Sequence, residues 1–186
     1  MILSSHYGTF EAVIKMNAIE ALMGRRSIRK YTEEKIPEEK ITTLLKVAMN
    51  APSGGNVQPW HFIVVNNHET LMKITEVHPY SKMLEQASHA IIVLGDATAH
   101  SKGIEEFWIQ DCSAAIENIL IAAHALGLGA VWLGGYPNME IVNGLKDLFQ
   151  VPDPFNSLGI ISLGYPAETK PPRENYEKAR VHLNKW

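Results

Sequence analysis

A long apolar segment near the middle of the chain constrains the fold more than any other feature. Residues 104–126 are apolar around most of a helical circumference, which indicates a helix that is buried on several sides. Glu117 and His124 interrupt it, so it is a poor membrane span. Gly127 ends it, and the apolar run 130–133 that follows predicts a strand. We therefore expect other elements to pack around this helix.

The remaining helices and strands are predicted from the spacing of apolar residues. Helices are expected at residues 17–24, 37–48, 69–77 and 138–149. Strands are expected at residues 61–65, 90–95, 130–133 and 158–163. The strands do not alternate cleanly, which is typical of a sheet covered on both faces. Because helices and strands are interspersed, the sequence favours an α/β or α+β fold, and 186 residues fit one domain.

Two helix ends carry local signals. Asn17, with Glu20 three positions on, predicts a capping box at the start of the first helix. Gly24 is placed to end that helix in a left-handed conformation. Pro37 is well suited to the first turn of the second helix, because its missing N–H costs nothing there.

The two ends of the chain differ from the rest. Residues 1–16 show no comparable pattern and are interpreted as a leader outside the core. They lack the basic region of a secretory signal. Residues 166–186 are rich in proline and charge, and we interpret them as a C-terminal arm.

The composition narrows the class of protein. Seventeen basic against twenty acidic side chains give a net charge of −3, which disfavours nucleic acid as the main partner. Cys112 is the one cysteine, so an intrachain disulfide and a multi-cysteine metal cluster are excluded, and a reducing cytoplasm fits best. The eight histidines show no metal-ligand spacing. The sequence predicts a soluble cytoplasmic protein that handles a small molecule, with no membrane partner and no metal.

A cluster of cations follows the first helix. Arg25, Arg26, Arg29 and Lys30 lie within six residues, with Ser27 among them. Guanidinium groups offer paired donors that match phosphate oxygens, and a serine hydroxyl adds another donor. By itself, the same run is more often a solvated basic loop or a nuclear-localisation-like run than a phosphate site.

A second segment has the composition of a ligand-binding loop. Residues 52–60 read Pro-Ser-Gly-Gly-Asn-Val-Gln-Pro-Trp. Glycines allow a backbone to approach a ligand closely, and Ser, Asn and Gln side chains can orient it through hydrogen bonds. Taken alone, this segment could also be an ordinary connection between a helix and a strand.

Together the two segments resemble the nitroreductase family. An Arg-Arg-Ser-x-Arg-x-Tyr run at 25–31 precedes a proline-opened helix and an Ala-Pro-Ser-x-x-Asn-x-Gln-Pro-Trp block at 51–60. The segments Gly-Leu-Gly-Ala-Val-Trp-Leu-Gly-Gly-Tyr-Pro at 127–137 and Leu-Gly-Tyr-Pro-Ala-Glu at 163–168 extend the likeness. The resemblance covers roughly residues 17 to 180.

The resemblance implies a fold, an assembly and a set of cofactor contacts. The fold would be α+β in three layers, with a mostly antiparallel sheet of about four strands flanked by helices. The assembly would be a homodimer with FMN at the subunit interface and the C-terminal arm reaching the partner. The cofactor-binding residues it implies are Arg25, Arg26, Ser27 and Arg29 at the phosphate, ribityl chain and pyrimidine, Pro52, Ser53, Gly54, Asn56 and Gln58 from the other subunit, Leu133, Gly134 and Gly135 beside the isoalloxazine, and Arg173, aided by Lys170, at the phosphate.

The resemblance also implies an activity. The chain would be an FMN-dependent oxidoreductase that uses NAD(P)H as co-substrate to reduce a nitroaromatic, quinone or enone by ping-pong hydride transfer. It implies no catalytic side chain. At the position of Gly134 some relatives carry glutamate, so the contacts of this chain to nicotinamide or substrate stay open. Whether Trp60 borders the flavin pocket is also open. Cys112 and His124 are expected to be ordinary packing residues.

Three alternatives belong to other classes. One is other flavin chemistry within the family, such as reductive dehalogenation or flavin breakdown, although this chain is short for the lid insertions those reactions need. Another is a flavin-binding carrier or redox sensor without significant turnover. The third is a non-flavin anion- or RNA-binding module on the basic cluster, against which the net charge argues.

Overall fold

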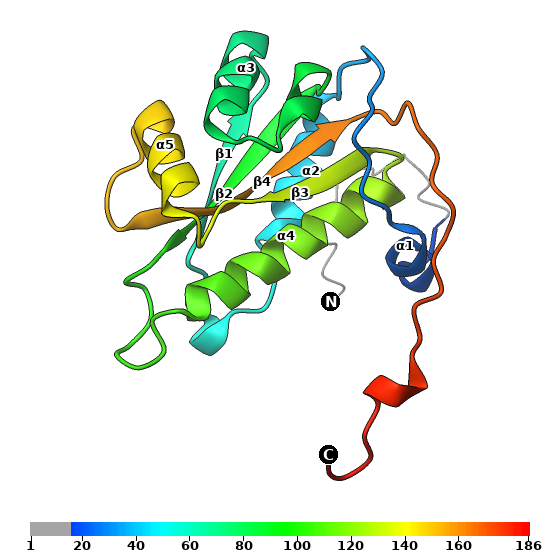
Figure 1. Ribbon diagram of the computed structural model, residues 1–186, viewed down its shortest axis with the longest axis vertical. Coiled ribbons are helices and arrows are strands. Elements are labelled where there is room, and N and C mark those ends of the chain that lie inside the picture. Colours follow the sequence, from blue (N-terminus) through cyan, green and yellow to red (C-terminus); the bar gives the residue numbers. More distant parts are fainter. Residues whose placement is uncertain (1–15) are drawn as a thin grey trace, which may run out of the picture.

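The structure is a computed structural model that describes residues 16–186 (Figure 1). The expectation of a leader at residues 1–16 therefore falls almost wholly outside the described residues. The described part contains the helices α1 (Ala18–Gly24), α2 (Glu38–Ala48), α3 (His68–Val77), α4 (Phe107–Ala125) and α5 (Met139–Phe149). Its strands are β1 (Trp60–Val65), β2 (His89–Asp96), β3 (Gly129–Gly134) and β4 (Phe155–Gly164). Short 3₁₀ turns lie at η1 (Gly54–Asn56), η2 (Lys82–Glu85) and η3 (Lys178–Arg180).

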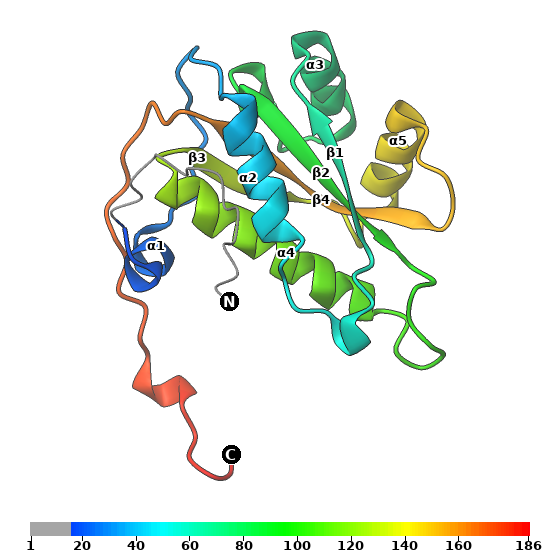
Figure 2. The same cartoon turned by 180° about the vertical axis from the view of Figure 1, so that it is seen from behind.

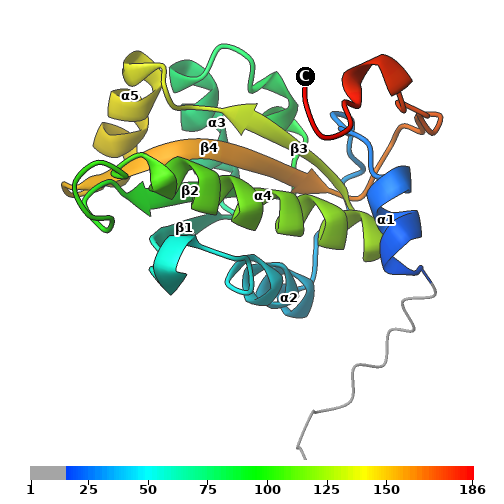
Figure 3. The same cartoon turned by 90° about the horizontal axis from the view of Figure 1, so that it is seen from below.

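The four strands form one antiparallel sheet in the order β1-β2-β4-β3. Helices α2 and α4 cover one face, and α3 and α5 cover the other (Figures 1 and 3). Side chains of β2 alternate between the two layers: Ile91 and Val93 pack toward α2 and α4, while Ile92 packs toward α3 and α5. The structure confirms the predicted α+β fold, with three layers and an antiparallel sheet.

Helix α4 is the long helix that the sequence predicts, but within the described residues it is fully buried along one side and not on several. One stripe of its residues is buried against α2 and the sheet, Cys112 and Ile116 among them. Burial is the main cause that raises the pKa of the Cys112 thiol to about 12, so this thiol is a packing group and not a nucleophile. No helix of the described residues is long and apolar enough to cross a membrane.

The helix ends confirm one expectation and correct two. Asn17 and Glu20 form the predicted capping box. Gly24 is not left-handed; a Cβ there would lie 2.6 Å from Nε2 of His124, so the close approach of α4 accounts for the glycine. Pro37 caps α2 one residue before its first turn and does not lie within that turn.

Most apolar side chains of α1 are not covered by other described residues of the chain. Ile19, Leu22 and Met23 are 68 %, 50 % and 56 % exposed, whereas Ala21 alone of this helix is buried. An exposed apolar patch of this kind marks a surface that packs against something else.

The basic segment that follows α1 lies along the outer edge of the sheet. Ser27 pairs with Ala130 of β3, and the Ile28 N–H donates to the Ala130 carbonyl over 2.9 Å. The Tyr31 hydroxyl lies 2.8 Å from the Ile28 carbonyl and 3.2 Å from the Ser162 carbonyl. Burial raises the pKa of this hydroxyl far above its ordinary value. The segment is thus fixed to both β3 and β4.

Candidate functional site

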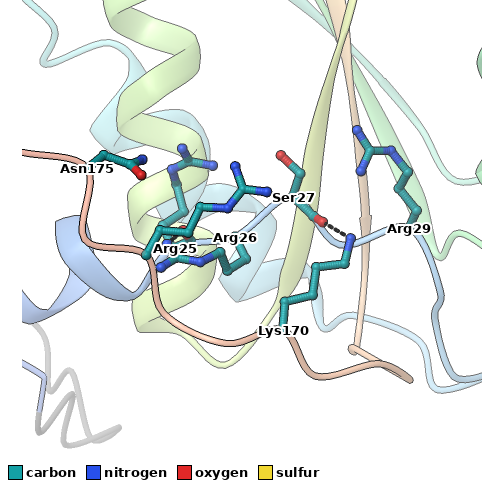
Figure 4. A pocket seen from close by; sticks show the side chains of 7 residues that line it. Arg25, Arg26, Ser27, Arg29, Lys170 and Asn175 are labelled. Atoms are coloured by element: carbon teal, nitrogen blue, oxygen red, sulfur yellow. Dashed lines mark hydrogen bonds between the residues drawn. The ribbon is translucent and has the colours of Figure 1, made fainter.

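A cavity of about 310 Å³ lies where the segment after α1 meets the C-terminal arm. We call it the basic pocket (Figure 4). Its lining residues are Arg25, Arg26, Ser27, Arg29, Lys170, Arg173 and Asn175. The structure therefore gathers all of the cations that the resemblance assigned to the phosphate, and it adds Asn175.

Arg26 holds the two walls of the basic pocket together. Its Nε donates to the Pro171 carbonyl over 2.8 Å, and its Nη1 lies 3.1 Å from the Met23 carbonyl and 2.6 Å from that of Arg25. The remaining nitrogen, Nη2, is buried and has no partner among the described residues. A buried donor of this kind is costly unless an acceptor satisfies it, and an anion in the pocket is such an acceptor.

The arm is joined to the basic segment by further contacts. Lys170 Nζ donates to the Ser27 carbonyl over 2.6 Å (dashed line in Figure 4) and lies 3.3 Å from the Glu168 carboxylate. That carboxylate accepts the Arg29 N–H over 2.6 Å, and this bond is the main cause that lowers the pKa of Glu168. The pocket wall is therefore set by bonds between segments far apart in the sequence.

The charge balance of the pocket is positive. Arg25 pairs with Glu117 of α4 at 3.1 Å, whereas Arg29 and Arg173 have no ion-pair partner among the described residues. Figure 4 shows the Arg29 guanidinium separated from that of Arg25, with Ser27 between them. Burial, followed by the charges of Arg25 and Arg26, lowers the pKa of the neighbouring His124. Cations on several sides of a concave surface suit the binding of a phosphate.

Residues 52–58, which we call the glycine loop, form a tight 3₁₀ turn after α2. The Gly54 N–H donates to Oδ1 of Asp111 over 3.0 Å, and the Gln58 N–H donates to Oγ of Ser53 over 3.0 Å. Asn56 and Gln58 both adopt positive φ angles, 57° and 53°. All five predicted site residues of the loop present at least part of their surface to solvent: Pro52, Ser53, Gly54, Asn56 and Gln58.

Residues 25–29, which include lining residues of the basic pocket, and the glycine loop lie at opposite ends of α4 (Figures 1 and 2). Gly24, just before the pocket, touches His124 in the last turn of the helix. Gly54 bonds to Asp111 in its first turns. No residue of the loop lines the basic pocket. Within one chain, the structure therefore does not bring the two predicted halves of the site together.

The third predicted group lies at the end of β3. Leu133 is buried, whereas at Gly134 a Cβ would have no atom within 4 Å, so open space borders the strand there. The Gly135 N–H donates to the Leu158 carbonyl over 2.9 Å. From Ala130 beside the pocket to Gly134, the strand runs about 13 Å at 3.3 Å per residue. Strand β3 therefore extends from the cations of the basic pocket to the open space at Gly134.

Sequence reasoning missed the side chains that fix these backbones. His78, which is 3 % exposed, accepts the Tyr80 N–H at Nδ1 over 3.2 Å, so its Nε2 carries the proton and donates to the Gly134 carbonyl over 2.8 Å. Asp111 holds the glycine loop from inside the apolar stripe of α4. A carboxylate at such a position signals a buried partner. Trp60, whose role was open, is 7 % exposed and packs in the core.

Comparisons with known proteins agree with this architecture. The model of the nitroreductase family matches residues 22–78 and 73–165. A Methanothermobacter thermautotrophicus protein, provisionally named an NADH dehydrogenase/NAD(P)H nitroreductase, is 50 % identical over 174 residues, covering 94 % of this chain and 90 % of the relative. An FMN-dependent nitroreductase structure from Clostridium difficile aligns with a TM-score of 0.84 at 31 % identity, over 90 % of this chain and 99 % of that one.

A further solved structure comes from Desulfovibrio desulfuricans. It is a provisionally named nitroreductase in complex with FMN, with a TM-score of 0.75 at 32 % identity, covering 90 % of this chain and 96 % of that one. The family model and the relative that is 50 % identical each match most of the chain. This chain belongs to the nitroreductase family.

Proposed function

We propose that the chain binds FMN and uses NAD(P)H to reduce an electron-poor small molecule, such as a nitroaromatic, quinone or enone. The observation that carries the proposal is the basic pocket, where five cationic side chains converge and a buried Arg26 donor has no partner among the described residues. Relatives named FMN reductase and FMN-dependent nitroreductase support the cofactor and the co-substrate.

The residues present fit FMN at both of its ends. Arg26 Nη2, the Ser27 hydroxyl and the Arg173 guanidinium would hold the phosphate. The open space at Gly134 would leave room for a flat ring beside β3. When bound, FMN would supply the hydride-transfer chemistry. Arg29 would stabilise negative charge near the pyrimidine side of the ring, and the buried Leu133 would help to keep water away.

The proposed site is shared between two copies of the chain. The glycine loop and the basic pocket lie at opposite ends of α4, so a loop that contacts the cofactor would come from a second copy. The uncovered apolar face of α1, with Ile19 and Met23 exposed, supports such an interface. Ping-pong turnover would follow, with NAD(P)H and the acceptor using the same open patch in turn.

The experiment is a titration of the purified protein with FMN, followed by visible spectra and NADH or NADPH oxidation with nitroaromatic and quinone acceptors. We expect tight FMN binding, turnover and a dimer in sedimentation. A protein that binds no FMN contradicts the proposal. Binding without NAD(P)H oxidation would favour the carrier or sensor, and a flavin-loaded monomer would contradict the shared site. The cytoplasmic location, the single-domain organisation and the absence of a nucleic-acid partner stay predictions.

A further inference from the structure

One buried carboxylate fixes the glycine loop to α4. Asp111, 5 % exposed, accepts the Gly54 N–H at Oδ1 over 3.0 Å and a hydrogen bond from His100 at Oδ2 over 2.7 Å. A carboxylate can only accept, so Nε2 of His100 carries the proton. The side chain of His100 is 2 % exposed. Both carboxylate oxygens are therefore used, and the orientation of Asp111 is set by His100.

The surroundings leave Gly54 little room to move. A Cβ at this position would lie 2.9 Å from Phe107 and 3.2 Å from Cε1 of His100. The rings of His100 and Phe107 meet edge to face, with centroids 5.8 Å apart. The two rings therefore pack closely against one side of the loop at Gly54. The hydrogen bond to Asp111 holds the Gly54 backbone in that position.

The conformation of the loop requires such a restraint. Asn56 and Gln58 have left-handed φ angles of 57° and 53°; asparagine tolerates this region, whereas for glutamine it is strained and needs support from its surroundings. The bond from Gln58 to Ser53 closes the loop on itself. The bond from Gly54 to Asp111 is the one hydrogen bond that joins residues 53–58 to other described residues.

We propose that Asp111, held by His100, is a positioning residue for the flavin. It sets the place of the glycine loop, and the loop in turn meets FMN in the basic pocket of the partner copy. This inference rests on the proposed function. Asp111 itself does not contact the cofactor, since both of its oxygens point to protein groups.

The test compares two variants of Asp111 in the full-length protein by FMN fluorescence titration and visible circular dichroism. Asp111→Ala leaves the Gly54 N–H unbonded, and we expect FMN to bind about 10- to 100-fold more weakly. Asp111→Asn keeps an oxygen for Gly54, and its amide can donate to His100 once the ring proton moves to Nδ1. We therefore expect Asp111→Asn to bind FMN within about 3-fold of wild type.

A matched control separates positioning from general stability. Asn118 also lies on α4, and its amide donates to the Val47 carbonyl of α2 over 3.0 Å. Asn118→Ala removes a comparable tether without touching the loop. We expect a similar loss of melting temperature in Asn118→Ala and Asp111→Ala, but weaker FMN binding and an altered flavin dichroism in Asp111→Ala alone.

Each outcome decides the inference. Unchanged FMN affinity in Asp111→Ala, or an equal loss in Asn118→Ala, would overturn it. If Asp111→Ala does not fold, His100→Ala takes its place, with the same expectation of weaker binding. Hydrogen exchange at the Gly54 amide of the flavin-free protein should be faster in the variant, and an unchanged rate also overturns the inference. Failure of the wild type to bind FMN, with faster exchange in the variant, would instead defeat the proposed function.

Discussion

The basic pocket and the glycine loop are built on different principles. The pocket joins segments that are 145 residues apart at the bond from Arg26 to Pro171, and flexible cationic side chains form it. The loop is continuous in sequence, carries no charge of its own and is held by the buried Asp111. The contribution of the pocket to FMN affinity should therefore depend on its positive charge. The contribution of the loop should depend on the position of its backbone. The predictions below test this difference, from the largest expected effect to the smallest.

Removing two cations from the pocket should have the largest effect. The double variant Arg25→Ala, Arg29→Ala loses two contacts of charged donors, each of about 1.5–3 kcal/mol, so FMN should bind roughly 100-fold or more weakly. Riboflavin lacks the phosphate but has the same ring, so it should lose only the part of this affinity that the proposed Arg29 contact contributes. Lys30→Ala, a neighbouring exposed cation outside the pocket, is the control. Full flavin occupancy in the double variant would show that neither guanidinium contributes to FMN binding.

Mixed dimers should show that the two halves come from different chains. One chain carries Arg25→Ala with Arg29→Ala, and the other carries Asp111→Ala, and the heterodimer is purified through two tags. One site then has both halves intact and the other has both defective. We expect about one tightly bound FMN per dimer, although each variant alone binds weakly. No recovery in the mixture would mean that both halves act within one chain.

Arg173 should report the contribution of the arm. Arg173→Ala removes one cation from the pocket, and an FMN affinity about 10-fold lower is expected from the loss of a single charged contact. The matched control is Arg180→Ala on the same arm, where Arg180 pairs with Glu177 at 2.6 Å outside the pocket. Equal losses in both variants would indicate a general effect of net charge.

The contact between Glu168 and the Arg29 amide should weaken in acid. The bond lowers the pKa of Glu168 from its ordinary 4.5, so this contribution to stability is present above pH 4.5 and is lost as the pH falls through the lowered pKa. The Arg29 amide proton shift, followed by NMR in the flavin-free protein, should titrate with a midpoint below 4.5. Glu168→Gln should abolish this titration. A midpoint at or above 4.5 in the wild type would contradict the assignment.

The elements could be predicted from sequence, but some of their ends could not. The apolar spacing placed every strand of the described sheet within a few residues, because burial dictates that pattern locally. Strand β4 nevertheless begins at Phe155, three residues before the prediction, and β2 extends to Asp96. These two residues pair with each other across the sheet, and such pairing between distant segments leaves no local pattern.

The residues of the candidate site also divide into those that could be predicted from sequence and those that could not. The cations of the basic segment were visible as a cluster, and the structure brings Arg173 and Lys170 beside them from the arm. Asn175 carried no signal, because an isolated asparagine in a polar tail has no pattern. Asp111 did have a sequence signal, because it is a single carboxylate within an apolar helical stripe. Its partner His100 lies in a loop and could be found only from the fold.

The bridge between Ser27 and Ala130 also covers an exposed edge of the sheet. Strand β3 is the last strand of the sheet, and an unprotected edge strand can pair with other molecules and start aggregation. The bridge occupies part of that edge, and Arg26 and Arg29 surround it with like charge. Covering and like charge are both features that disfavour edge-to-edge pairing, so the cations proposed for the cofactor also lie where they oppose association through β3.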